Sequence, residues 1–230
     1  MIEICVGSKI VVKNPTPEIL KWCKENLIID NPDFYKKEKM GKWTGNTPME
    51  IWLFEKNGND LWIPFGCLKN LWELCPDKSA YELQISPIKP RNYESHINLY
   101  PYQEKAVNDA LCAKNGVLVM PCGSGKTVCG LEIISKIGGR ALWLTHTQDL
   151  LNQSKARAES VLEQGGYGTI TAGKVDIGTT ITFATVQTMA KIDLSQYRDT
   201  WDVIVCDESQ HVCGSPTNVT QFYKVISNLS

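Results

Sequence analysis

Short apolar runs alternate with longer amphipathic segments through the second half of the chain. Residues 117–119, 141–144 and 203–206 are uncharged, which favours strands that are buried on both faces of a sheet. The segments at 101–114 and 150–162 carry apolar residues at helical spacing. Such alternation is typical of an α/β fold, in which helices flank a parallel sheet. Further strands are expected at 169–171 and 180–183, and further helices at 128–137 and 217–229.

The first half has shorter elements and more turn residues. Residues 2–6 and 9–13 are expected to form a hairpin, and Thr16-Pro17 predicts a helix start with a capping hydroxyl before proline. Asn31-Pro32 is expected to end that helix. Asn57-Gly58 is a turn signal and predicts a second hairpin. Its strands are expected at 49–55 and 61–63, followed by a helix at 68–74 and a strand at 81–85.

These patterns divide the chain into three parts. Residues 1–88 are expected to form a small α+β domain. Residues 89–99 are expected to be a linker, because two prolines and no apolar period mark residues 86–91, which overlap its start. Residues 100–230 form the predicted α/β domain.

Composition and charge narrow the classes of protein that fit. With 24 Lys+Arg against 25 Asp+Glu, the formal net charge is −1. No overall basic field therefore attracts nucleic acid, and any such affinity must come from local patches. The apolar runs are too short to span a bilayer, and the first residues lack the basic region of a signal peptide. A cytoplasmic protein without a membrane partner is expected.

The cysteines favour a reducing compartment. There are nine of them, an odd number, and none forms a Cys-x-x-Cys pair. We expect reduced thiols that mostly serve as small core residues. Cys122 is the exception, because it lies inside a glycine-rich loop where alkylating reagents can reach it.

That loop is the strongest candidate for chemistry. Residues 120–127 read Met-Pro-Cys-Gly-Ser-Gly-Lys-Thr, between a predicted strand and a predicted helix, as a phosphate-binding loop requires. The glycines let backbone amides point inward at a helix N-terminus and bind an anion. Lys126 can reach the terminal phosphates of a nucleotide, and Thr127 can bind the bridging Mg²⁺. Met120 replaces the first glycine of the usual pattern.

A pair of acids supports this interpretation. Asp207 and Glu208 follow directly after the predicted strand 203–206. An acid at the C-terminal end of a parallel strand can hold the water shell of Mg²⁺, and a second acid can orient or deprotonate the attacking water. On its own, a Gly-Ser-Gly-Lys-Thr stretch has a minor alternative, an ordinary surface loop, and the acids count against it.

Smaller motifs complete a recognisable set. They are Tyr-Pro-Tyr-Gln at 100–103, Thr-His-Thr-Gln-Asp-Leu-Leu-Asn-Gln at 145–153, Thr-Val-Gln-Thr at 185–188 and Asp-Glu-Ser-Gln-His at 207–211. In this order, with the phosphate loop, the set resembles the first RecA-like domain of a superfamily 2 helicase of the DEAD/DEAH-box type. The resemblance covers residues 100–229. It implies a RecA-like P-loop sheet flanked by helices, ATP and Mg²⁺ as cofactors, and DNA as partner.

The resemblance also implies a role for individual residues. Gln103 resembles the glutamine that reads adenine. The implied nucleotide-binding residues are Tyr102, Gln103, Pro121, Cys122, Gly123, Ser124, Gly125, Lys126, Thr127 and Val128. The implied catalytic residues are Lys126, Asp207, Glu208 and Gln210, with Thr127 and Asp207 as metal ligands. The implied nucleic-acid contacts are Thr147, Thr185, Gln187 and Thr188. Relatives often have histidine where this chain has Gln210, and proline where it has His146.

The first half resembles a second kind of domain. Gly-Lys-Trp-Thr-Gly at 41–45 and Ile-Pro-Phe-Gly at 63–66 are similar to the N-terminal domain of UvsW-like phage recombination helicases, which implies an accessory nucleic-acid-binding domain. The candidate contacts are Lys36, Lys37, Lys39, Lys42 and Trp43. We expect these residues to form a basic loop, whose lysines contact phosphates and whose aromatic ring stacks on bases. Two plainer alternatives remain open: the lysines are a solvated face, and the tryptophans are core.

The leading hypothesis is the ATP-binding part of a superfamily 2 DNA helicase or translocase that unwinds or branch-migrates duplexes in a bacterial or phage-infected cytoplasm. A second RecA-like domain with an arginine finger is expected in the full-length protein, so this chain alone should hydrolyse ATP slowly at most. Two alternatives remain. One is the motor portion of a restriction or remodelling translocase, and the other is a DNA-binding module that no longer hydrolyses ATP.

Overall fold

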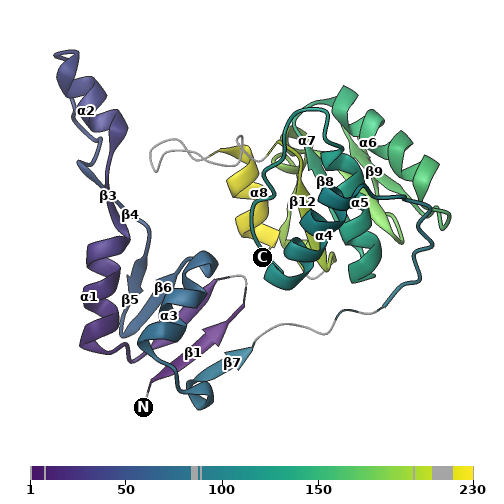
Figure 1. Ribbon diagram of the computed structural model, residues 1–230. Coiled ribbons are helices and arrows are strands. Elements are labelled where there is room, and N and C mark those ends of the chain that lie inside the picture. Colours follow the sequence, from purple (N-terminus) through teal and green to yellow (C-terminus); the bar gives the residue numbers. More distant parts are fainter. Residues whose placement is uncertain are drawn as a thin grey trace. The chain divides into compact units, whose positions relative to one another are not determined.

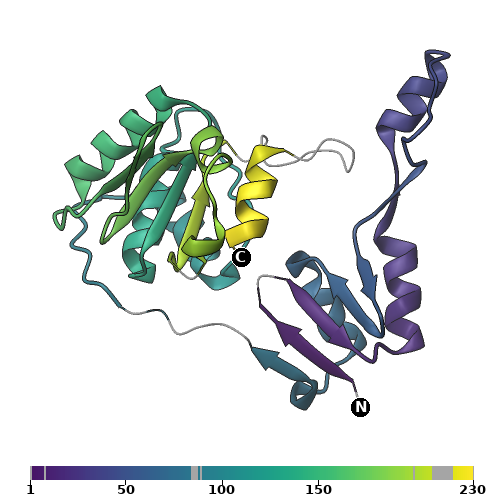
Figure 2. The ribbon, with the colours of Figure 1, turned by 180° about the vertical axis from the view of Figure 1, so that it is seen from behind.

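The computed structural model describes residues 2–7, 9–83, 88, 90–198, 200–208 and 220–229. The chain divides into two compact units, Met1–Pro87 and Ile88–Ser230, shown in Figure 1 and from behind in Figure 2. Each unit has its own hydrophobic core.

The first unit is built on a five-stranded sheet in the order β5-β6-β2-β1-β7. Its strands are β1 (Glu3–Val6), β2 (Ile10–Lys13), β5 (Glu55–Asn57), β6 (Asp60–Ile63) and β7 (Tyr81–Leu83). β1 and β2 form the expected antiparallel hairpin, and β7 pairs with β1 in parallel.

Two helices complete the core of this unit. They are α1 (Pro17–Asn26) and α3 (Leu68–Leu74), and two 3-10 turns lie at η1 (Phe65–Cys67) and η2 (Lys78–Ala80). The Thr16 hydroxyl caps α1 by accepting a hydrogen bond from the Ile19 amide at 3.3 Å. Ile19 and Leu71 pack into the same buried cluster as the strand residues. Capping and apolar spacing therefore act together, as the sequence predicts.

An arm extends from the body of the first unit (Figure 1). It consists of β3 (Ile28–Asp30), α2 (Pro32–Lys39) and β4 (Glu50–Trp52), with β3 and β4 paired antiparallel. Asn31 joins these parts and is completely buried. Its side-chain oxygen accepts from the Asp33 amide at 3.1 Å, and its side-chain amide donates to the Pro48 carbonyl at 2.7 Å.

The arm corrects three expectations. Asn31-Pro32 does not end α1; it begins α2, because asparagine caps a helix start and proline suits the first helical position. The expected strand at 49–55 is two strands, since β4 pairs with β3 and only β5 pairs with β6. The expected basic loop is also wrong in shape: Lys36, Lys37 and Lys39 lie in the last turn of α2, where cations are favourable next to the helix C-terminus.

The second unit contains a five-stranded sheet in the order β10-β9-β11-β8-β12. Its strands are β8 (Ala141–Thr145), β9 (Gly168–Thr171), β10 (Lys174–Asp176), β11 (Ile181–Thr185) and β12 (Val203–Cys206). All pairs are parallel except β9 with β10. The predicted α/β class is confirmed.

Successive side chains along β8 pack on opposite faces of this sheet. Ala141 and Trp143 join a cluster with α5 (Lys126–Ile137) and α6 (Gln148–Val161). Leu142 and Leu144 join a cluster on the opposite face, with α7 (Val186–Met189) and α8 (Gln221–Leu229). The remaining helix, α4 (Pro101–Ala113), packs against α5, and η3 (Ser195–Tyr197) packs against α8.

One predicted strand is wrong. Residues 116–120 have no regular secondary structure, and no hydrogen bond joins their backbone to the backbone of another described residue. Val117 is 70% exposed and Val119 is 86% exposed, so this apolar run buries little. The apolar pattern signals a tendency to form a strand, but a strand also needs a neighbour whose backbone groups accept the pairing.

Two findings apply to the described part of the chain as a whole. None of its helices combines the length and the apolar character needed to cross a membrane. The cysteines that it contains are all free thiols, and Cys112 and Cys122 are the exposed ones among them.

We predict that Asn31→Ala will destabilise the first unit by about 1–3 kcal/mol, because it removes the cap of α2 and leaves the Pro48 carbonyl without its donor. Thermal and urea denaturation of the chain will measure the loss. Asn26→Ala is the matched control, since the Asn26 side chain is exposed and bonds only its own helix. Equal stability of the two variants would show that Asn31 does not hold the arm.

Candidate nucleotide-binding site

The phosphate loop owes its shape to two glycines with positive φ. Gly123 has φ +75° and Gly125, which caps α5, has φ +86°. A side chain at Gly125 would also collide with Gln103, because a β-carbon there would lie 2.5 Å from Nε2 of that residue. The loop therefore presents bare backbone at the start of α5, where unpaired amides favour an anion.

Lys126 lies across the loop that precedes it. Its ammonium is 3.5 Å from the Met120 carbonyl oxygen and 3.4 Å from that of Pro121. The Ser124 hydroxyl donates to the same Pro121 oxygen at 2.7 Å. These long contacts to neutral carbonyls are weak substitutes for an ionic partner, so Lys126 is available for an anion that enters the loop.

The two acids stand at the carboxyl end of β12, next to the loop. The Asp207 amide donates to the Leu144 carbonyl at 2.9 Å, which extends the pairing of β12 with β8 by one residue. Glu208 has φ +61°, and its amide donates to the Asp207 carboxylate at 3.1 Å. Burial raises the pKa of the Asp207 carboxyl, and the charge of Glu208 adds to the rise, whereas Lys126 opposes it.

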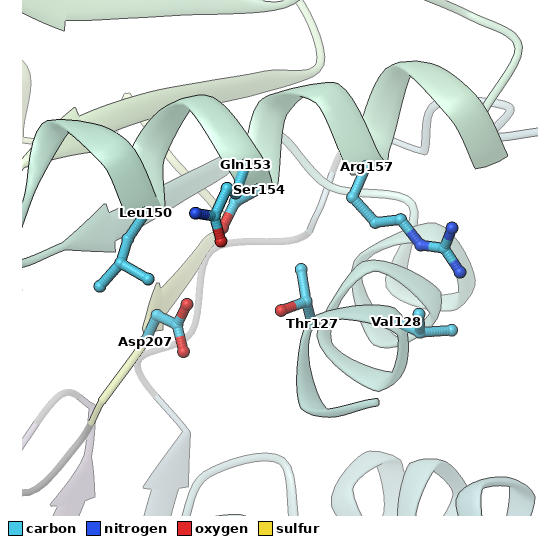
Figure 3. A pocket seen from close by; sticks show the side chains of 7 residues that line it. All are labelled: Thr127, Val128, Leu150, Gln153, Ser154, Arg157 and Asp207. Atoms are coloured by element: carbon cyan, nitrogen blue, oxygen red, sulfur yellow. The ribbon is translucent and has the colours of Figure 1, made fainter. Parts of the chain in front are cut away.

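Thr127 and Asp207 face each other across a cavity of about 270 Å³. Figure 3 shows the Thr127 hydroxyl on the side towards the Asp207 carboxylate. Hard oxygen ligands of this kind suit Mg²⁺, which is commonly held by one or two protein groups together with phosphates and water. The residues present therefore fit a nucleotide-bound Mg²⁺.

Gln103, the candidate adenine reader, is engaged with the loop. It is 5% exposed. Its side-chain oxygen accepts from the Tyr100 amide at 2.9 Å, and its amide nitrogen donates to the Ser124 carbonyl at 2.8 Å. The Tyr102 hydroxyl donates to the same carbonyl at 3.2 Å. To bind an adenine edge, the Gln103 side chain must give up its hydrogen bonds to Tyr100 and Ser124 and form bonds to the base instead.

The candidate nucleic-acid residues of this unit gather at one edge of the sheet. Thr185 ends β11 opposite the end of β8, and its hydroxyl lies 2.9 Å from that of Thr188. Thr147 caps α6 by accepting from the Leu150 amide at 3.3 Å. The side chains of Gln187 and His146 are 3.2 Å apart. The structure therefore brings these motifs together beside the nucleotide site.

The other predicted residues lie elsewhere. Lys36, Lys37, Lys39, Lys42 and Trp43 belong to the first unit, and all five are exposed. Lys37 donates to the Thr47 hydroxyl at 2.6 Å. Gln210, a predicted catalytic residue, falls outside the described residues, as does His211.

The structure adds residues beyond the motifs. Leu150, Gln153, Ser154 and Arg157 of α6 form one wall of the cavity, and of these Ser154 and Arg157 lie outside the motif at 145–153. They recur at the three- and four-residue spacing of a single helix face. Ser154 was the available signal, because it is a polar residue on the face of α6 that the apolar pattern assigns to the core.

Residues 96–229 match the family profile described as type III restriction enzyme, res subunit. This match spans more than half of the chain, including every motif described for the second unit. The chain belongs to this family. Its second unit is a superfamily 2 helicase or translocase domain, and the resemblance drawn from the sequence is confirmed.

Two curated relatives fit the same assignment. A protein of Halobacterium salinarum, provisionally named DNA 3'-5' helicase Rad25, is 33% identical over 130 residues, which are 54% of this chain and 21% of the relative. A protein of Acanthamoeba polyphaga mimivirus, provisionally named an ATP-dependent RNA helicase, is 30% identical over 184 residues, 76% of this chain and 34% of the relative. The chain thus spans about a fifth to a third of these relatives.

A solved structure resembles both units of the chain. The crystal structure of the UvsW helicase from bacteriophage T4 matches with a TM-score of 0.67 and 16% identity, covering 99% of this chain and 88% of that one. At this identity the likeness concerns the fold alone. Because the match covers 99% of this chain, the first unit also has a counterpart in that structure.

We predict that MgATP will protect Cys122 from alkylation and will not protect Cys112. Both thiols are exposed, but Cys122 lies in the loop that the phosphates would cover, whereas Cys112 lies near the C-terminal end of α4. Treatment with iodoacetamide, followed by peptide mass spectrometry with and without MgATP, gives the two rates. Cys112 serves as the internal control. Equal protection of both thiols, or of neither, would contradict binding at the loop.

Proposed function

We propose that the second unit binds MgATP and is the ATP-binding part of a DNA helicase or translocase that couples hydrolysis to unwinding or branch migration of duplex DNA. One observation carries this proposal: Lys126 and Thr127 at the start of α5 lie beside Asp207 and Glu208 at the end of β12. A helix start supplies the attraction for phosphates, and the acids supply the contacts for metal and water.

Each residue has a defined task in this proposal. The loop amides and Lys126 bind the phosphates, and Thr127 and Asp207 hold Mg²⁺, which neutralises phosphate charge when it is bound. Glu208 is placed to orient the attacking water or take its proton. Gln103 reads adenine after releasing the Ser124 carbonyl. Thr127 and Asp207 line the same cavity, and Lys126 and Glu208 are their direct neighbours in the chain, which supports these roles.

Contact with DNA is proposed at two places. Thr147, Thr185, Gln187 and Thr188 offer hydroxyl and amide groups, which suit phosphate oxygens and carry no sequence information. On the first unit, the exposed lysines of the arm and Trp43 supply charge and a stacking surface. The printed name of the Halobacterium salinarum relative supports DNA, whereas that of the mimivirus relative allows RNA.

A second candidate is the motor of a restriction or remodelling translocase. The description of the matching family, a restriction-enzyme subunit, favours it, and it uses the same nucleotide chemistry. A DNA-binding module that no longer hydrolyses ATP is less well supported, because Lys126, Thr127, Asp207 and Glu208 are all present and placed together.

We predict that Lys126→Ala will weaken ADP or ATP binding by about 1.5–3 kcal/mol, roughly 10- to 100-fold, because a charged hydrogen-bond donor to the phosphates is lost. Isothermal titration calorimetry with Mg²⁺ present measures the change. Lys136→Ala is the matched control, since Lys136 lies on the same helix and pairs with Glu132 at 3.5 Å. Equal affinities of the wild type and Lys126→Ala would reject this site.

We predict that replacing Lys36, Lys37, Lys39 and Lys42 with alanine will lower DNA affinity and flatten its salt dependence. Each lost phosphate contact removes about 0.9 from the log–log salt slope on duplex DNA. Fluorescence anisotropy across a salt series provides both values. The control replaces four other exposed lysines of the first unit, namely Lys21, Lys24, Lys56 and Lys69. If both quadruple variants behave alike, the arm lysines are a solvated surface.

A further inference from the structure

The cavity beside the loop has a wall without an assigned role. α6 contributes Gln153, Ser154 and Arg157 to it, opposite Thr127 and Asp207. Figure 3 shows Gln153 and Ser154 reaching from α6 into the space between Thr127 and Asp207, whereas Arg157 extends past Val128. Two polar side chains of α6 therefore face the place where a metal ion bound to Thr127 and Asp207 would lie.

Ser154 is unusual among these residues because its side chain is largely buried while its hydroxyl opens onto the cavity. It is 3% exposed as a residue, and within the described part of the chain its hydroxyl makes no hydrogen bond to another residue. The hydroxyl is nevertheless not one of the fully buried polar atoms that lack a partner, because it lines the cavity. A hydroxyl on a cavity wall obtains its partner from whatever fills the cavity.

The chemistry of hydrated Mg²⁺ indicates what fills it. Mg²⁺ is octahedral and dehydrates reluctantly, so a site with one or two protein ligands and phosphate oxygens keeps several waters. Water bound to a cation turns its hydrogens outward, so neighbouring groups must accept hydrogen bonds. The Asp207 carboxylate, the Ser154 hydroxyl and the Gln153 carbonyl can all accept, whereas the Arg157 guanidinium cannot.

The size of the cavity agrees with this content. At about 30 Å³ per water in the liquid, a cavity of about 270 Å³ has room for several ordered waters beside the ion. Five of the seven residues that line the cavity carry polar side chains, and Leu150 and Val128 are the apolar ones. It is therefore suited to hold water that is fixed by hydrogen bonds on two sides.

We propose that this cavity holds the water shell of the nucleotide-bound Mg²⁺, and that Ser154 is a positioning residue that accepts a hydrogen bond from a metal-bound water. Gln153 is the second acceptor on the same wall. The inference rests on the proposed function, because it assumes a nucleotide that brings Mg²⁺ to Thr127 and Asp207. It assigns a part in metal retention to Ser154, which lies outside the motif at 145–153.

Ser154→Ala tests this inference through the contribution of Mg²⁺ to ADP affinity. Calorimetry measures ADP binding to the 230-residue chain with Mg²⁺ and with EDTA, and the ratio of the two affinities is the gain from the metal. We expect Ser154→Ala to reduce this gain by roughly 2- to 10-fold, the effect of one lost hydrogen bond, and to leave the affinity in EDTA unchanged. Ser154→Thr, which keeps a hydroxyl, should restore the gain.

Ser160→Ala is the matched control, since Ser160 is exposed on the same helix and its hydroxyl donates to the Arg157 carbonyl at 2.7 Å. An unchanged gain in Ser154→Ala would overturn the inference, and so would a gain that Ser154→Thr fails to restore. A fall in affinity in EDTA equal to that with Mg²⁺ would also overturn it, because the effect would then be structural. A wild type whose ADP affinity ignores Mg²⁺ would instead refute the proposed function itself.

Discussion

Burial of β8 on both faces is the constraint on which the second unit depends. The strand pairs with β11 on one side and β12 on the other, and every residue along it is buried. Pairing with β12 fixes the position of Asp207 relative to β8, because the Asp207 amide donates a hydrogen bond to the Leu144 carbonyl. Pairing with β11 places Thr185 opposite Thr145. The candidate nucleotide site and the candidate nucleic-acid residues thus both lie at the carboxyl ends of strands that pair with β8.

Charge at the nucleotide site follows from this placement. Asp207 and Glu208 are adjacent acids, and burial already raises the pKa of Asp207. Phosphates would bring further negative charge to the same place, against which the loop offers Lys126 and the start of α5. The arrangement is electrostatically unfavourable until a divalent cation lies between acids and phosphates. Under the proposed function, a nucleotide would therefore bind together with its metal ion.

Sequence reasoning succeeded where the local signal and the tertiary requirement agree. The glycine loop, the cap at Thr16 and the apolar strand before Asp207 each follow from residues that are close in the chain. It failed at Asn31-Pro32, because this pair can either end a helix or begin one. It also failed at residues 117–119, because an apolar run forms a strand only when a neighbouring strand is available for pairing. Ser154 could not be assigned a role, because a small residue on an inner helix face reads as core. Its situation depends on Asp207, which is far away in sequence.

The unpaired run beside the phosphate loop has a practical consequence. Val117 and Val119 are 70% and 86% exposed, and residues 116–120 make no backbone–backbone hydrogen bond to another described residue. An apolar, uncharged segment of this kind is a template for edge-to-edge association between molecules. Copies of this chain can therefore associate through it at high concentration, and a charged residue at position 117 or 119 is the simplest means of preventing that association.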